Sequence, residues 1–182
     1  MWRIHRHIGM GGDQIVKAIA GDAVERDHGD SLRAAARDEF KRLRDECAPL
    51  EGAHELVVEL KRRGLVVVLA SSSNQDDLDH FLDELAVRDL VDDWTTADDV
   101  ARTKPHPDVI RAALEKAGTG NAVMVGDSRW DIEAAANGGL ETVCVITGGW
   151  SEQELRDHGA VAVYGSLVEL RAHLGETPLG AD

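Results

Sequence analysis

The sequence predicts an α/β fold, with an open, mostly parallel sheet and helices on both of its faces. Three observations lead to this prediction. From residue 53 onward, short apolar runs alternate with segments that have the apolar spacing of helices. The apolar runs of residues 65–70 and 143–147 carry no charge, which is typical of strands buried on both faces. Residues 1–50, by contrast, show only helical patterns.

Two helices are expected in the first part of the chain, and residues 13–20 form the shorter one. Ser31 is a plausible N-cap for the second, because an apolar stripe with helical spacing follows it. Charged residues fill the face opposite this stripe. That stripe has spacings of three and four and consists of Leu32, Ala35, Ala36, Phe40, Leu43 and Cys47. Pro49 then marks a boundary. We therefore expect residues 1–50 to form a helical part and residues 51–182 an α/β part.

Strands and helices are expected to alternate along the rest of the chain. The expected strands are residues 65–70, 94–96, 122–125, 143–147 and 162–164. The expected helices are residues 53–63, 75–86, 108–117, 129–137, 152–158 and 167–174. In open α/β sheets, ligands bind at the carboxyl ends of the strands. The residues that follow each strand are therefore the first candidates for function.

Composition and charge limit the classes of partner. At 182 residues the chain has the length of about one domain, and its 43% apolar content is that of a globular protein. The net charge of −14 disfavours broad contact with nucleic acid or an anionic membrane, because both require a basic surface. The two cysteines, Cys47 and Cys144, are too few for a disulfide scaffold, and we expect both to be small buried residues. A cytoplasmic protein is the simplest interpretation.

Hydroxyl and amide side chains follow the first expected strand. Ser71 and Ser72 can donate a hydrogen bond to a phosphoryl oxygen, and Asn74 is a further candidate ligand-binding residue. The alternative is that Ser73 or Asn74 only caps the next helix. These residues alone favour the capping interpretation.

Lys104 follows the second expected strand, within the segment Lys-Pro-His-Pro. Pro105 restricts Lys104 to an extended conformation, and a lysine on such a stiff loop can serve as a point charge for phosphate. The alternative is a solvated surface lysine, which is the usual fate of this residue type. The sequence alone does not decide between the two.

Asp127 directly follows the expected strand 122–125, and Asp131 lies four residues further on, in the first turn of the next helix. This spacing places both carboxylates on one side of a helix N-terminus. Magnesium prefers one or two carboxylates together with waters and substrate phosphate. The alternative is that Asp127 caps the helix and that Asp131 only interacts with the helix dipole.

Together, these residues resemble a known family. Ser71, then Lys104-Pro105, then Gly126-Asp127-x-x-x-Asp131 is similar to motifs two, three and four of the haloacid dehalogenase superfamily. The resemblance covers about residues 50–150 and is strongest to the branch of the phosphoglycolate phosphatases and β-phosphoglucomutases. It implies a Rossmann-like core for residues 51–182 and a partial helical cap for residues 1–50.

The resemblance also implies roles for the site residues. Ser71 would bind the phosphoryl group of a small phosphorylated metabolite, and Lys104 would neutralise its charge. Asp127 would bind Mg²⁺ directly, and Asp131 would support the metal or its waters. Gly126 favours a phosphatase over a mutase, because the mutases tend to carry an acidic residue there. The rival interpretations are a module that binds phosphate and Mg²⁺ without turnover, and a purely structural domain.

One part of the family pattern is absent. Members begin with a strand that ends in Asp-x-Asp-Gly-Thr and carries the nucleophile and the general acid/base, and this sequence contains no such segment. That strand lies in the middle of the family's sheet. We therefore expect a sheet with a gap, or neighbouring strands forced together. The expected origin is a start codon assigned too late, with genuine loss of activity as the alternative. The substrate and the oligomeric state are left open.

Two features of the cap-like part are further candidates. Arg3, His5, Arg6 and His7 form a basic cluster, which either meets an anionic substrate or is a solvated helix face. Gly9 and Gly11 form a flexible segment that, by the resemblance, faces the active site.

Overall fold

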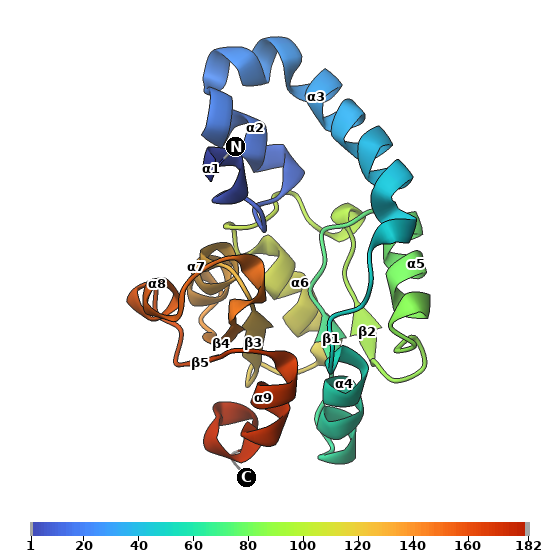
Figure 1. Ribbon diagram of the computed structural model, residues 1–182, viewed down its shortest axis with the longest axis vertical. Coiled ribbons are helices and arrows are strands. Elements are labelled where there is room, and N and C mark those ends of the chain that lie inside the picture. The colour runs from blue at the N-terminus through green and yellow to red at the C-terminus, as the bar shows by residue number, and fades with distance from the viewer. Residues whose placement is uncertain (1, 181–182) are drawn as a thin grey trace.

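Among residues 2–180, which this computed structural model describes, five short strands form two parallel sheets (Figure 1). In the first sheet β1 (Val68–Leu69) pairs with β2 (Asp93–Trp94). The second sheet has the order β3 (Val123–Gly126), β4 (Glu141–Val145) and β5 (Ala162–Tyr164). The α/β class and the parallel strands are confirmed. The expected interruption of the sheet is observed between β1 and β3.

β1 is shorter than the expected strand 65–70, because the interruption leaves this segment with a strand partner on one side only. Val67 and Leu69 accept backbone hydrogen bonds from Asp92 and Thr95, both at 2.9 Å, so this segment pairs on the β2 side. The ladder with β2 is only two residues long. The remaining apolar residues of the run lie outside the ladder, in neither a helix nor a strand.

Helices cover both faces of the sheets. They are α4 (Ala53–Arg62), α5 (Gln75–Glu84), α6 (Asp108–Ala117), α7 (Arg129–Asn137), α8 (Glu152–Asp157) and α9 (Leu167–Ala172). Successive side chains of β4 point to opposite faces of the sheet, so their contacts show which helices cover each face. Val143 packs with Leu56 of α4 and Leu170 of α9, whereas Cys144 packs with residues of α7 and α8. Helices on both faces are thus confirmed.

Between residue 2 and α4 the chain forms three α-helices, namely α1 (Trp2–His5), α2 (Gly12–Ala20) and α3 (Asp22–Leu43). The expected N-cap at Ser31 is wrong, because Ser31 lies inside α3 and its Oγ donates to the carbonyl of His28 at 2.9 Å. The first turns of α3 are polar, so apolar spacing did not reveal them. They are stabilised by charge pairs such as that of Arg33 with Glu25 at 2.8 Å.

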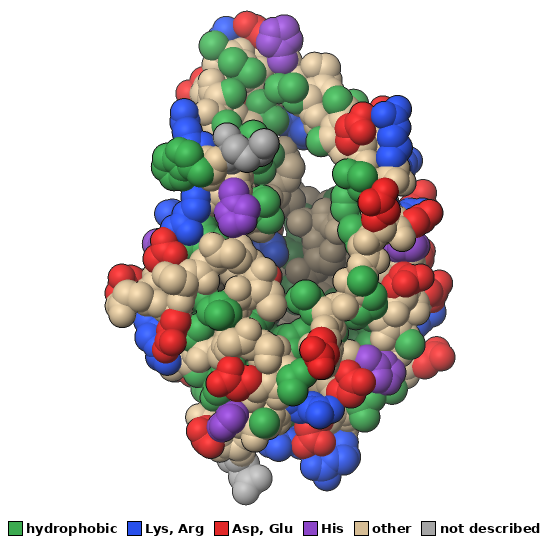
Figure 2. All heavy atoms as spheres, viewed as in Figure 1, with side chains coloured by type: hydrophobic (Ala, Val, Ile, Leu, Met, Phe, Trp, Pro, Cys, Tyr) green, Lys and Arg blue, Asp and Glu red, His purple; other side chains and the backbone are tan. Residues whose placement is uncertain are grey.

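The apolar stripe of α3 remains largely in solvent. Leu32, Phe40 and Leu43 are 44, 38 and 52% exposed, and Figure 2 shows an open hollow beneath this helix. The prediction that Cys47 is buried is wrong, because α3 ends at Leu43 and Cys47 lies in the exposed segment that follows it. Cys144 is fully buried, as expected. No helix within residues 2–180 combines the length and the apolar character needed to cross a bilayer.

Candidate functional site

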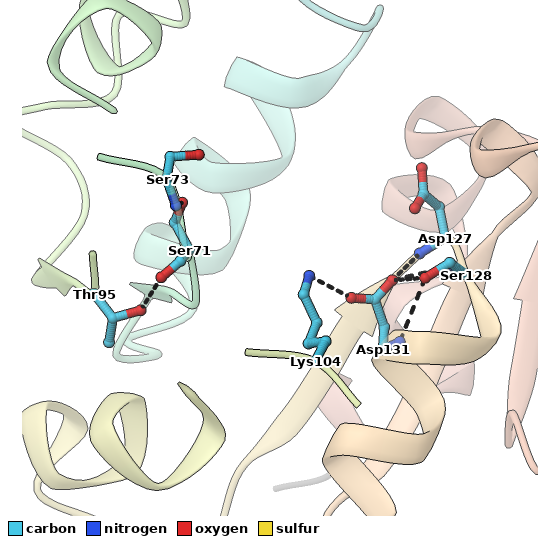
Figure 3. A network of polar contacts seen from close by, with 7 residues as sticks. All are labelled: Ser71, Ser73, Thr95, Lys104, Asp127, Ser128 and Asp131. Atoms are coloured by element: carbon cyan, nitrogen blue, oxygen red, sulfur yellow. Dashed lines mark hydrogen bonds and ion pairs between the residues drawn. The ribbon is translucent and has the colours of Figure 1, made fainter. Parts of the chain in front are cut away.

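Polar side chains from two directions border one cavity at the carboxyl ends of β1 and β3 (Figure 3). The cavity has a volume of about 940 Å³. Ser71 and Ser72 line it on the side of β1, and Asp127 and Asp131 line it on the side of β3, together with Lys104. Five of the six predicted site residues therefore share a single cavity, although the two groups are not in direct contact in Figure 3.

Ser71 is held in place by its backbone. Its carbonyl accepts a hydrogen bond of 2.7 Å from Oγ1 of Thr95, a fully buried residue that follows β2. Its Oγ accepts from the backbone N–H of Ser73 at 3.1 Å. Because Oγ acts as an acceptor in that contact, the hydroxyl proton of Ser71 is left for donation to a ligand.

Asn74 is the N-cap of α5. Its Oδ1 accepts from the backbone N–H of Asp77 at 3.0 Å, and its Nδ2 donates to the carboxylate of Asp77. The capping role is therefore confirmed. Both ends of the amide are used inside the protein, and a role of Asn74 toward a ligand stays a prediction.

Asp131 is the best-connected carboxylate of the site. It is 4% exposed, and its Oδ2 accepts hydrogen bonds from Oγ of Ser128 at 2.7 Å and from its backbone N–H at 3.1 Å. The N–H of Asp127 approaches the same oxygen at 3.3 Å. Ser128 in turn caps α7 and forms a capping box with Asp131. Ser128 is not among the site residues predicted from the sequence, although the pattern Ser-x-x-Asp before a helix signals it.

The other oxygen of Asp131 binds Lys104. The distance from Nζ of Lys104 to Oδ1 of Asp131 is 2.8 Å, and the two side chains are 17% and 6% exposed. The alternative of a solvated surface lysine is therefore wrong. The Lys104-Pro105 peptide bond is cis, and the carbonyl of Lys104 accepts from the N–H of Gly11 at 3.2 Å.

Asp127 is half-buried next to this pair, and its Oδ2 accepts from Oγ1 of Thr147 at 2.9 Å. Burial raises the pKa of Asp127, and the negative charge of Asp131 raises it further. The hydrogen bond from Thr147 and the charge of Lys104 oppose this increase in pKa. A bound cation would offset the cost of keeping Asp127 ionised, so this donor set fits a hard divalent ion.

The number of acidic side chains also bears on the kind of metal. Within residues 2–180, no group of three or more His, Cys, Asp or Glu side chains could enclose a metal ion. Mg²⁺ is commonly held by one or two carboxylates, with waters and substrate phosphate as the remaining ligands. Asp127 and Asp131 match that pattern, whereas a closed structural metal site would need more protein ligands.

The loop between α1 and α2 reaches the same cavity. Gly9 and Met10 line it, and the carboxylate of Asp13 accepts from the hydroxyl of Thr103 and, at 3.2 Å, from its N–H. A Cβ atom on Gly11 would overlap the side chain of Thr103. A residue with no side chain is therefore required where this loop packs against the Lys104 segment.

The basic cluster near the N-terminus contacts the α/β part of the chain. The guanidinium of Arg6 lies 3.6 Å from the ring centroid of Trp150 and forms an ion pair with Glu154 of α8. The ring of His7 stacks on Trp130 of α7, with 5.6 Å between their centroids. Arg6 and His7, in the turn that follows α1, therefore contact the core, and they are not a solvated helix face.

The sequence is similar to those of known proteins. The profile of a family described as haloacid dehalogenase-like hydrolase matches residues 2–145. A phosphoglycolate phosphatase from Rhodospirillum rubrum is 31% identical over 133 residues, which are 72% of this chain and 55% of that protein. The pyrophosphatase PpaX from Bacillus cereus is 35% identical over 97 residues, or 52% of this chain and 45% of that protein. The chain thus spans about half the length of these curated relatives.

Solved structures agree at the level of the fold. The crystal structure of a hydrolase from Pseudomonas syringae has a TM-score of 0.88 and 31% identity, covering 96% of this chain and 82% of that one. CbbY from Rhodobacter sphaeroides, solved in complex with xylulose-(1,5)bisphosphate, has a TM-score of 0.73 and 23% identity, with 93% and 78% covered. This second similarity concerns the fold alone.

Proposed function

Because the chain belongs to the haloacid dehalogenase-like hydrolase family, we propose that it binds a small phosphorylated metabolite and Mg²⁺ for hydrolysis of a phosphomonoester. One observation carries the proposal. The partly buried ammonium group of Lys104 and the carboxylates of Asp127 and Asp131 border one cavity with the hydroxyl-bearing segment after β1. Such a site combines donors for phosphoryl oxygens with ligands for a divalent cation.

The phosphoryl group would lie between the two sides of the cavity. Ser71 and Ser72 would donate hydrogen bonds from the β1 side, and Lys104 would contribute a positive charge from the opposite side. Asp131 holds the ammonium group of Lys104 in place through the 2.8 Å contact. Lys104 thus has a fixed position before a ligand arrives, which limits the loss of side-chain entropy on binding.

Mg²⁺ would be held by Asp127 as a direct ligand and by Asp131 directly or through a water. When bound, the cation would supply positive charge to stabilise the transferring phosphoryl group. Thr147 and Ser128 orient the two carboxylates through hydrogen bonds of 2.9 and 2.7 Å. Such supporting contacts fix the direction of a ligand oxygen and tune its affinity for a metal.

Binding of phosphate and Mg²⁺ without turnover is the second candidate function. It is favoured by one feature of the sequence, the absence of an Asp-x-Asp-Gly-Thr segment. Hydrolysis through a covalent intermediate requires an attacking group. The residues described above bind, orient and neutralise, but none of them is positioned as a nucleophile.

Release of phosphate and binding of Mg²⁺ separate the two functions. Phosphate release from p-nitrophenyl phosphate and from phosphoglycolate is measured with and without Mg²⁺, and Mg²⁺ binding is measured by calorimetry. Asp127→Asn should weaken Mg²⁺ binding at least tenfold, while Asp38→Asn on the exposed face of α3 serves as the matched control. Binding without release supports the second function. Unchanged Mg²⁺ binding in Asp127→Asn would overturn the assignment of the metal site.

A further inference from the structure

The helices α1, α2 and α3 form an arch over the cavity (Figure 1). We call residues 2–44 the helical arch. Its longest helix, α3, has 22 residues and is therefore about 33 Å long. Within the arch, the guanidinium of Arg3 donates to the carbonyl of Ile19 at 3.2 Å, which ties α1 to the end of α2. Figure 2 shows the hollow beneath α3, so this helix spans the opening without filling it.

One end of the helical arch contacts the side of the cavity that carries the two candidate metal ligands. The ring of His7 stacks on Trp130 of α7, with 5.6 Å between the centroids. The N–H of Gly11 donates to the carbonyl of Lys104 at 3.2 Å, and Arg6 forms an ion pair with α8. This end is thus fixed to α7, to α8 and to the Lys104 segment.

The other end contacts the side of the cavity that carries Ser71. Arg44, the residue after α3, forms an ion pair with Asp77 of α5, and 3.2 Å separates Nη1 of Arg44 from Oδ1 of Asp77. The side chain of Asp77 is only 9% exposed, and its second oxygen accepts from Nδ2 of Asn74. Asn74 directly follows residues 71–73, so Arg44 is linked to the candidate phosphate-binding segment through two side chains.

An apolar contact supports the same end of the helical arch. The rings of Phe40 in α3 and Phe81 in α5 have centroids 6.2 Å apart, and Phe81 also lines the cavity. Within residues 2–180 no ladder joins β1 to β3, and side chains of α4 and α6 form a further link between the two sides. The helical arch adds a link at the carboxyl ends of the strands, where the site residues lie.

We propose that the helical arch is a brace that sets the separation between Ser71 and Lys104, and that Arg44 and Arg6 are positioning residues for a bound phosphoryl group. The identity of the ligand rests on the proposed function, whereas the bracing itself requires no ligand. Neither arginine lines the cavity, and each acts by holding one end of the arch. A ligand that contacts both sides binds only molecules with the right separation, so its Kd rises in inverse proportion to their fraction.

Mg²⁺ and phosphate should respond differently when one end of the helical arch is released. Asp127 and Asp131 lie four positions apart at the start of α7, so both belong to one side of the cavity. A change in the separation of the two sides leaves them together. Phosphate, in contrast, would contact both sides. An arch that only stabilises the fold would change both affinities or neither.

The affinity for inorganic phosphate measures the bracing effect. Arg44→Ala should raise the Kd of phosphate roughly fivefold, as expected if about one molecule in five keeps the right separation. Calorimetry at a constant concentration of Mg²⁺ gives this value. The Kd of Mg²⁺ alone should change less than about twofold, because Arg44 contacts the opposite side of the cavity. An unchanged Kd for phosphate, or equal losses for both ligands, would overturn the proposal.

Arg33→Ala is the matched control. Arg33 lies in the same helix as the bracing contact with Phe81, but its ion pairs with Glu25 and Asp30, at 2.8 and 2.7 Å, stay within α3. Arg33→Ala therefore removes a cation from the helical arch and leaves both of its ends attached. It should leave the Kd of phosphate unchanged. A rise equal to that in Arg44→Ala would count against the brace.

Spin labels measure the separation itself, without phosphate or Mg²⁺. Glu84→Cys in α5 and Ala136→Cys in α7 place labels at exposed positions on the two sides. Cys47→Ser removes the exposed native cysteine, and the fully buried Cys144 should stay unlabelled. Pulsed electron resonance should give a narrow distribution of distances, which Arg44→Ala should broaden. An unchanged distribution would overturn the proposal. If the unmodified protein binds no phosphate, the proposed function fails, and the distances still test the brace.

The two ends of the helical arch should not act independently. Arg6→Ala should broaden the distances as Arg44→Ala does, because an arch released at one end no longer fixes a separation. The second substitution should then add less than about twofold to the Kd of phosphate, whereas two independent losses would multiply. Full multiplication would show that the two arginines act separately, against a brace.

Two further variants separate bracing from a loss of folding. Arg44→Ala leaves the buried carboxylate of Asp77 without its cation, which is costly. The double variant Arg44→Met/Asp77→Asn releases the same end without an unpaired charge and should give the same rise in Kd. Arg44→Lys keeps the charge and should restore most of the affinity. A folded double variant that binds phosphate as tightly as the unmodified protein would overturn the proposal.

Discussion

The Nζ atom of Lys104 lies 2.8 Å from Oδ1 of Asp131, and the side chains of this ion pair are only 17% and 6% exposed to solvent. It joins two of the predicted site residues, 27 positions apart in the chain. Stability and ligand binding should therefore depend on the same contact.

Lys104→Ala should lower the free energy of unfolding by about 3 kcal/mol, because it leaves the buried carboxylate of Asp131 without its cation. Urea denaturation measures the loss. Lys41→Ala, at an exposed position of α3, should stay within about 0.5 kcal/mol of the unmodified protein. Similar losses in the two variants would show that the ion pair does not stabilise the fold.

Ser128→Ala should destabilise the protein by about 2 kcal/mol, because it removes both the cap of α7 and a hydrogen bond to a buried carboxylate. Ser151 forms the same kind of capping box with Glu154 at the exposed start of α8, which makes Ser151→Ala a matched control. Its cost should be about 1 kcal/mol, since water replaces the lost contact. Thermal unfolding of both variants gives the comparison, and equal costs would contradict the role of burial.

Asp127 should make the protein less stable as the pH rises, whereas an aspartate with a lowered pKa has the opposite effect. Burial and the charge of Asp131 raise its pKa in the folded state, so the folded protein holds this proton more tightly than the unfolded chain. The contribution of Asp127 is therefore most favourable below its unfolded pKa of about 3.8 and is lost as the pH rises through the folded pKa. Asp127→Asn removes this effect and should be the more stable protein near pH 7.

The difference in Tm between Asp127→Asn and the unmodified protein tests this expectation as a function of pH. It should shrink as the pH falls through the raised pKa of the folded state and vanish below the unfolded pKa of about 3.8, because Asp127 is then protonated in both states. Mg²⁺ should reduce the same difference near pH 7 by stabilising the ionised carboxylate. A difference that is constant with pH would mean that the carboxylate is not destabilised by its surroundings.

Gly11→Ala should disturb the contact between the loop after α1 and the Lys104 segment, since its Cβ would overlap the side chain of Thr103. We expect a loss of roughly 1–3 kcal/mol, as for other overpacked positions. Gly12→Ala is the control, because its Cβ meets no atom within 4 Å and alanine favours a helix. Denaturation of the two variants measures the contrast, and a stable Gly11→Ala would show that the loop is free to move away.

Much of the site could be predicted from sequence because its residues follow strands. The apolar runs before Ser71 and Asp127 place both at the same edge of a parallel sheet. The spacing of four then brings Asp131 beside Asp127. This reasoning needs only local patterns, and the structure places these residues around one cavity.

Contacts between distant segments could not be predicted in this way. Thr147 is 20 positions from Asp127, and Arg6 is 148 positions from Glu154, so no periodicity links them. The burial of Cys47 was predicted wrongly for a related reason. A helical apolar stripe indicates a face that can be buried, but whether another segment covers it depends on tertiary structure.

The division of the strands into two sheets has a consequence for cooperativity. Ladder hydrogen bonds join β3, β4 and β5, but within residues 2–180 no ladder joins them to β1 and β2, which pack against them through side chains, including those of α6 and α4. Side-chain packing alone couples the two halves less strongly than a continuous ladder would. The segment from β1 to β2 should therefore open as a separate unit, at a lower free energy than the three-stranded half, and unfolding should depart from a two-state transition.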